Sequence, residues 1–330
     1  MRVVLHVGLP KTGTTAIQRT LAANRPVLAA QGILYPASLG RVYHWKLAAL
    51  ALQDPLAPWA GATARTDGLE GGPDAILHAL QDEIAQVRPN ILLISSEHLT
   101  SRLQFPTDYE NLRTLLAAID AQTEALIYLR PIADYAAASY TESVKNGRHT
   151  PFHVSDVLQN PDRYDYNRVI RRWEDTLHSV TIRVFDRRRF PDGNVINDFL
   201  DALGIHGITP STDAENISPD AVGIEVFRRL NAVNVARRGP LLRRAILSDI
   251  VSLNAGPKFG LSKSDAATIN QCYARGIEAL HSRYDNGIDW KSLTCDSEEV
   301  TVTEVDVIDR LLALIQRLAF KELPPGKTPK

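Results

Sequence analysis

Eight residues near the N-terminus, Gly8 to Thr15, have the composition of a loop that binds a phosphate or sulfate group. Gly8 and Gly13 permit backbone angles that turn consecutive N–H groups toward an anion. Lys11 adds a positive charge between them. Three hydroxyls add hydrogen-bond donors: Thr12, Thr14 and Thr15. We therefore expect this segment to hold an anionic group.

The spacing of this segment is close to that of the nucleoside-triphosphate loop, G-x-x-x-x-G-K-[ST]. Thr14 occupies the position where that motif has its lysine, and Lys11 stands three residues earlier. A triphosphate with Mg²⁺ needs the usual lysine and an aspartate that holds the metal. The displaced lysine instead favours an anion whose leaving oxygen lies beside Lys11.

A second pair of anion-binding candidates lies more than a hundred residues further on. Arg130 directly follows an apolar run that is predicted to be a strand, and Ser139 follows on the next predicted helix. Ligands of open α/β sheets bind at the carboxyl ends of strands. A guanidinium there can grip a phosphate through two hydrogen bonds, and a serine hydroxyl can donate a third.

Candidates for a general base follow two other predicted strands. Glu97 and His98 come directly after the apolar run at 91–94, and His44 follows the one at 33–35. A base must lie within hydrogen-bond reach of the proton that it removes. We rank Glu97 first, His98 second and His44 third. Alternative roles for Glu97 are a helix or turn cap, or an ion pair with Arg102.

Together these residues resemble the family of sulfotransferases that use 3′-phosphoadenosine 5′-phosphosulfate (PAPS). The run from Pro10 to Thr15 looks like the family's 5′-phosphosulfate loop, P-K-[ST]-G-T-T, and Arg130 with Ser139 resembles its 3′-phosphate site. Pro131 follows Arg130 directly where the family often has Asp-Pro, so the turn here is one residue shorter. The resemblance covers roughly residues 1–205 and is closest to carbohydrate sulfotransferases and their bacterial relatives.

This resemblance implies a function and a ligand. The chain is expected to move the sulfuryl group of PAPS to a hydroxyl acceptor, a carbohydrate or glycolipid, by in-line displacement, leaving adenosine 3′,5′-bisphosphate (PAP). Lys11 would stabilise the leaving group, and the chemistry requires no metal. Two alternatives stay open: a P-loop kinase or NTPase, and a non-catalytic nucleotide-binding protein.

The elements that must position these residues alternate between strand and helix over the first 200 residues. Short apolar runs predict strands at 3–7, 33–35, 91–94, 124–129 and 180–185, and helical spacing predicts helices at 15–23, 74–87, 109–119, 133–144 and 195–203. Such alternation predicts an α/β fold, with a P-loop-type parallel sheet flanked by helices. Tyr166 and Trp173 are expected to pack in its core.

The pattern changes beyond residue 204, where only helices are predicted, at 221–236, 241–253, 264–282 and 302–318. We therefore expect a PAPS-binding core at 1–210 and a helical extension at 211–330 that shapes the acceptor pocket.

Composition narrows the function classes. The formal net charge of -1 favours neither nucleic acid nor a membrane surface as a partner. Two distant cysteines, Cys272 and Cys295, form neither a disulfide framework nor a zinc site. No signal peptide and no transmembrane segment are recognisable, so a cytoplasmic location is expected.

Overall fold

A computed structural model describes residues 1–9, 11–53, 72–119, 122–210, 218–233, 240–284, 288–294 and 299–321. Pro10 of the predicted loop, Cys295 and the end of the chain from residue 322 lie outside this set. Within it, the chain forms two compact units. The first comprises 1–130, 165–213 and 276–293, and the second comprises 131–164, 214–275 and 294–330.

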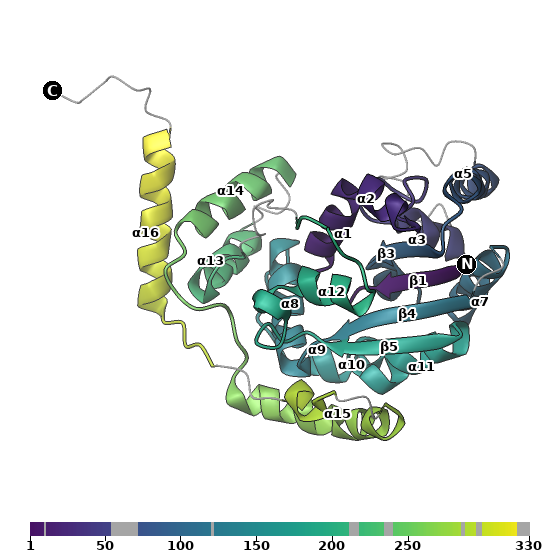
Figure 1. The fold of residues 1–330 in the computed structure, drawn as a ribbon. Helices are drawn as coiled ribbons and strands as arrows, with labels where there is room; N and C mark the ends of the chain where they lie inside the picture. The colour runs from purple at the N-terminus through teal and green to yellow at the C-terminus, as the bar shows by residue number, and fades with distance from the viewer. Residues whose placement is uncertain are drawn as a thin grey trace. The chain divides into compact units, whose positions relative to one another are not determined.

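The first unit is built on a five-stranded sheet in the order β2-β3-β1-β4-β5, and every pairing is parallel. β1 is the central strand, between β3 and β4 (Figure 1). The strands are β1 Arg2–Val7, β2 Ile33–Leu34, β3 Ile91–Ser96, β4 Gln122–Leu129 and β5 Ser179–Val184. This arrangement confirms the predicted α/β class and all five predicted strands.

Helices cover both faces of this sheet, as the parallel pairing requires. Alternate residues of the central strands, such as Val4, Leu93 and Tyr128, share one hydrophobic core with α1, α2 and α12. The residues between them point to the other face and are equally inaccessible; Leu5 and Ile94 are both 0% exposed. The helices of this unit are α1 Thr14–Ala23, α2 Arg25–Ala30, α3 Trp45–Ala51, α5 Gly72–Val87, α6 His98–Arg102, α7 Pro106–Ala117, α11 Tyr166–Thr176 and α12 Val195–Ala202, with 3-10 turns η1 Pro191–Gly193 and η3 Trp290–Thr294.

The second unit is helical over its described residues. Its helices are α8 Ile132–Lys145, α9 Ser155–Leu158, α10 Pro161–Tyr164, α13 Ala221–Ala232, α14 Pro240–Ser252 and α16 Glu304–Lys321, and α15 Lys263–Arg283 contributes residues to both units. One hydrophobic cluster joins α8, through Tyr140 and Val144, to Phe227 of α13, Ile250 of α14 and Leu314 of α16.

This shared core explains why the units differ from the contiguous division predicted at residue 210. Segment 131–164 groups with the C-terminal helices because α8 packs against them, and segment 276–293 groups with the sheet. Of the helices that the structure describes, none has both the length and the apolar character needed to cross a bilayer.

Candidate functional site

The predicted anion loop leaves the carboxyl end of the central strand β1 and runs into α1. Its first glycine is required by close packing, because a Cβ on Gly8 would lie 2.2 Å from the methyl carbon of Thr14. Val7, the last residue of β1, lies opposite Ser96 of β3. The loop and the end of β3 therefore share one edge of the sheet.

The backbone of the loop takes a left-handed conformation at two positions, Lys11 with φ 72° and Gly13 with φ 77°. Such alternation turns neighbouring N–H groups to the same side, as in anion-binding nests. Thr12 between them is fully buried, and its hydroxyl donates to the carbonyl of Leu9 at 2.7 Å. Thr12 thus offers an anion its backbone rather than the hydroxyl that the sequence suggested.

The N-terminus of α1 faces the same loop. Gly13 is its N-cap, and no side chain caps the helix. The Gly13 carbonyl accepts the N–H groups of Ala16 and Ile17. The backbone N–H groups that come before Ala16 in the first turn have no hydrogen-bond partner inside the helix, as at the start of any α-helix. An anion placed here would meet both those donors and the positive end of the helix dipole. Thr15, on this turn, is exposed.

Arg130 lies beside this loop, although 119 positions separate it from Lys11. Its Nη1 donates to the Lys11 carbonyl oxygen at 3.3 Å. The guanidinium carbon lies 5.9 Å from the ring centre of Phe185, and a Cβ on Gly13 would lie 3.4 Å from the same ring. Tyr166, predicted to be a core residue and 1% exposed, also donates its hydroxyl to the Arg130 carbonyl at 2.6 Å. Arg130 is therefore positioned from three sides.

Glu97 also reaches the loop. Thr14 donates its hydroxyl to Glu97 Oε2 at 3.2 Å. Glu97 stands at the N-cap position of α6, but its side chain caps nothing there. Its neighbour His98 is half-buried and lies against Tyr43, with 5.7 Å between the ring centres. Burial lowers the pKa of His98, so this imidazole is neutral near pH 7.

His44 has a different environment. It is 0% exposed, and burial lowers its pKa to about 3. Its Nδ1 accepts the backbone N–H of Ser95 at 3.0 Å. Since that contact fixes Nδ1 as the acceptor, the ring proton is on Nε2 and the basic lone pair is already occupied. This geometry makes His44 an unsuitable base.

Ser139, the remaining predicted residue, belongs to the second unit and is 9% exposed. Its hydroxyl oxygen accepts a hydrogen bond from Arg163 Nη2 at 3.1 Å. Arg163 was not among the residues singled out from the sequence. It lies 24 positions from Ser139 on another helix, and no motif joins the two.

Comparisons with known proteins give one partial sequence match and one structural match. No protein-family model matches the chain. An uncharacterized protein from Archaeoglobus fulgidus is 33% identical over 85 residues, which is 25% of this chain and only 23% of that protein. A sulfotransferase from Alicyclobacillus acidocaldarius aligns with 88% of this chain and 99% of its own, with a TM-score of 0.48 and 14% identity. Similarity at that level does not establish a shared fold, so function is inferred from the site residues themselves.

Proposed function

We propose that this chain is a PAPS-dependent sulfotransferase that acts on a hydroxyl acceptor. The observation that carries the proposal is the contact between Arg130 and the Lys11 carbonyl. Two cationic residues from separate motifs meet beside the open N-terminus of α1. A nucleotide with anionic groups at both its 5′ and 3′ positions can bind both cationic residues. 5′-AMP carries an anionic group at one position and can use only one of them.

Within this proposal, PAPS supplies a sulfuryl group attached to a phosphate leaving group. Lys11 and the first-turn N–H groups of α1 offset the charge that grows on the bridging oxygen as the sulfur–oxygen bond breaks. Arg130 recognises the 3′-phosphate, as the resemblance implies. The acceptor oxygen forms the new bond to sulfur and gives up its proton.

Glu97 is the proposed acceptor of that proton. Its carboxylate is held next to the loop by Thr14, and a carboxylate can take a proton without prior deprotonation. His98 is the second candidate, since its lowered pKa keeps it in the neutral form that a base requires. The resemblance to carbohydrate sulfotransferases favours a carbohydrate or glycolipid as the acceptor.

Calorimetric titration of the full chain with PAP, ATP and 5′-AMP in the absence of Mg²⁺ tests the proposal. PAP should bind more tightly than ATP. Arg130→Ala should weaken PAP binding by about 10- to 100-fold, the range for a lost hydrogen bond to a charged group, and change 5′-AMP binding little. Equal losses for PAP and 5′-AMP would remove Arg130 from the 3′-phosphate site. Tighter binding of ATP, with Mg²⁺-dependent hydrolysis, would instead identify a P-loop NTPase.

A further inference from the structure

Tyr43 is an exposed aromatic residue at the end of a short loop, residues 40–43, that leads into α3. The loop belongs to the first unit, as does the candidate anion loop. Tyr43 is 39% exposed, whereas the two residues that follow it, His44 and Trp45, are 0% and 1% exposed. One large ring is therefore presented to solvent next to a tightly packed segment.

The backbone of this loop is held in place by side chains from the rest of the first unit. Arg25 of α2 donates to the Arg41 carbonyl oxygen at 2.6 Å. The hydroxyl of Tyr35, which follows β2, donates to the Val42 carbonyl oxygen at 2.7 Å. Tyr43 is therefore carried by an ordered backbone, so a ligand that contacts it need not first immobilise the loop.

The loop reaches the edge of the sheet where the candidate bases stand. The backbone N–H of His44 donates to the carbonyl oxygen of Ser95, near the carboxyl end of β3, at 2.9 Å. The Tyr43 ring centre lies 5.7 Å from that of His98, with 53° between the ring planes. His98 directly follows Glu97. Tyr43 is thus a near neighbour of both residues that could accept the acceptor's proton.

The geometry of sulfuryl transfer assigns these residues to one side of the reaction. In an in-line displacement, the attacking oxygen and the leaving phosphate oxygen lie on opposite sides of sulfur. A general base must reach the hydroxyl of the acceptor, so the groups around Glu97 and His98 lie on the acceptor side. Tyr43 should therefore contact the acceptor and not the nucleotide.

The combination of groups also indicates the class of acceptor. Tyr43 offers a flat apolar ring, and a carboxylate and an imidazole stand beside it. A sugar has the matching pattern, with C–H groups on the face of its ring and hydroxyls around the edge. Those C–H groups carry a small positive charge, which the negative face of an aromatic ring attracts.

We propose that Tyr43 stacks against the ring of a sugar acceptor and holds one of its hydroxyls beside Glu97. Tyr43 is then a specificity-determining residue of the reaction. In the transfer step the hydroxyl oxygen bonds to sulfur, the bond from sulfur to the phosphate oxygen of PAPS breaks, and the hydroxyl proton passes to Glu97. This inference rests on the proposed function, because that function supplies the sulfuryl donor.

Sulfate transfer by the full-length chain tests the inference, with labelled PAPS as donor. The acceptors are a panel of methyl hexopyranosides and oligosaccharides, with 2-naphthol as an aromatic alternative. Tyr43→Ala should raise the KM for a sugar roughly 10-fold and change kcat little, because stacking is lost while the base remains. Tyr43→Phe keeps the ring and should retain a KM close to that of the wild type.

Two controls accompany these variants. Phe105→Ala removes another exposed aromatic residue of the first unit, 58% exposed and separated from His98 by α6, and should leave the KM unchanged. Calorimetry with PAP should give the same affinity for Tyr43→Ala as for the wild type. Circular dichroism verifies folding, and Tyr43→Leu replaces the alanine variant if that variant unfolds.

The other outcomes contradict the inference in distinguishable ways. A lower kcat for Tyr43→Ala at unchanged KM would show that Tyr43 only positions His98. A roughly 10-fold loss of PAP affinity would place the ring against the nucleotide. If the wild type binds PAP but sulfates no sugar, whether or not it sulfates 2-naphthol, the inference is wrong and the assignment of the donor stands. If the wild type does not bind PAP, the proposed function is wrong as well.

Discussion

Lys11 occupies a position where the backbone favours glycine over any other residue, since its φ is 72°. A left-handed conformation costs a residue with a Cβ roughly 1–2 kcal/mol. A lysine at such a position suggests that its side chain is needed for function. The same segment has glycine at position 13, where φ is also positive.

Lys11→Gly separates the two effects. Relief of backbone strain and the greater entropy of unfolded glycine nearly cancel, so the free energy of unfolding should stay the same or rise by up to about 1 kcal/mol. Turnover should fall by roughly 10²- to 10³-fold, the loss typical of one electrostatic donor at a leaving or developing charge. Urea unfolding measures the first, and transfer of labelled sulfate from PAPS to a panel of hydroxyl acceptors measures the second.

Arg88→Gly is the matched control for Lys11→Gly. Arg88 also has a positive φ, 48°, but it follows α5 and has no place in the proposed site. Its replacement should affect stability in the same way and leave turnover unchanged. Wild-type turnover by Lys11→Gly would show that the charge of Lys11 is not needed.

At the scale of elements, Asp220 links three segments of the second unit. It is the N-cap of α13, where it accepts the N–H of Gly223 at 2.7 Å. Its other oxygen accepts the N–H groups of Ala255 and Gly256, and Arg310 of α16 donates to both oxygens at 3.0 and 2.9 Å. Burial alone would raise the pKa of Asp220, but these hydrogen bonds outweigh it and hold the pKa below its ordinary value of 3.8.

Asp220→Asn should therefore lower the free energy of unfolding by about 3–5 kcal/mol at pH 7, the cost of leaving a buried partner charge uncompensated. A carboxylate with a depressed folded pKa stabilises the native state above its unfolded pKa and loses that contribution as pH falls through the folded pKa. The difference between wild type and variant should be constant from pH 5 to 7 and shrink below about pH 3.8. Urea unfolding by circular dichroism at several pH values measures it.

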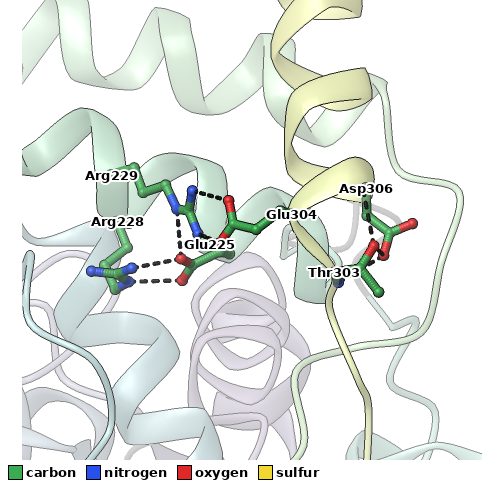
Figure 2. Close-up of polar contacts among 6 residues, drawn as sticks. All are labelled: Glu225, Arg228, Arg229, Thr303, Glu304 and Asp306. Carbon is green, nitrogen blue, oxygen red and sulfur yellow. Dashed lines mark hydrogen bonds and ion pairs between the residues drawn. The ribbon is translucent and has the colours of Figure 1, made fainter.

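Glu304→Gln provides the comparison for Asp220→Asn. Glu304 also pairs with an arginine, Arg229 (Figure 2). However, 70% of its side chain is exposed. Exposed ion pairs contribute little, so its loss should be much smaller at every pH. An equal loss for both variants would contradict the importance of burial at Asp220.

The elements also show what the sequence could predict and why. Each of the five strands is recognisable in the sequence as a short apolar run, and four of the five are buried over most of their length. Helices α3 and α6 were missed, because at 7 and 5 residues they are too short to show a period and are stabilised by tertiary packing. α11 is not predicted although the sequence places its Tyr166 and Trp173 in the core, because two buried positions seven residues apart do not by themselves specify a helix.

For the candidate site, motifs located the residues of the first unit but not their contacts. The sequence singled out Lys11 and Arg130, and the structure places them in contact. The sequence could not show that the Thr12 hydroxyl donates to the Leu9 carbonyl. Nor could it show that Arg163 donates a hydrogen bond to Ser139. Both depend on local geometry that has no counterpart in spacing along the chain.

At the scale of the whole molecule, the net charge does not attract an anionic nucleotide over long distances, because the 37 lysines and arginines are balanced by 38 aspartates and glutamates. Affinity must come from local groups of the site. Three of these are Lys11, Arg130 and the N-terminus of α1, all in the first unit. Binding of PAP should therefore stabilise that unit.

Tryptophan fluorescence can follow this unit, because the tryptophans that the structure describes, Trp45, Trp173 and Trp290, all belong to it. At a PAP concentration of about 100 Kd, linkage adds roughly 2.7 kcal/mol to the free energy of unfolding, which corresponds to a rise of a few degrees in the fluorescence-detected melting temperature. Lys11→Gly at the same PAP concentration should show a smaller rise, because it binds the nucleotide less tightly. An equal rise with ATP, or no rise with PAP, would mean that the first unit does not recognise a 3′-phosphorylated nucleotide.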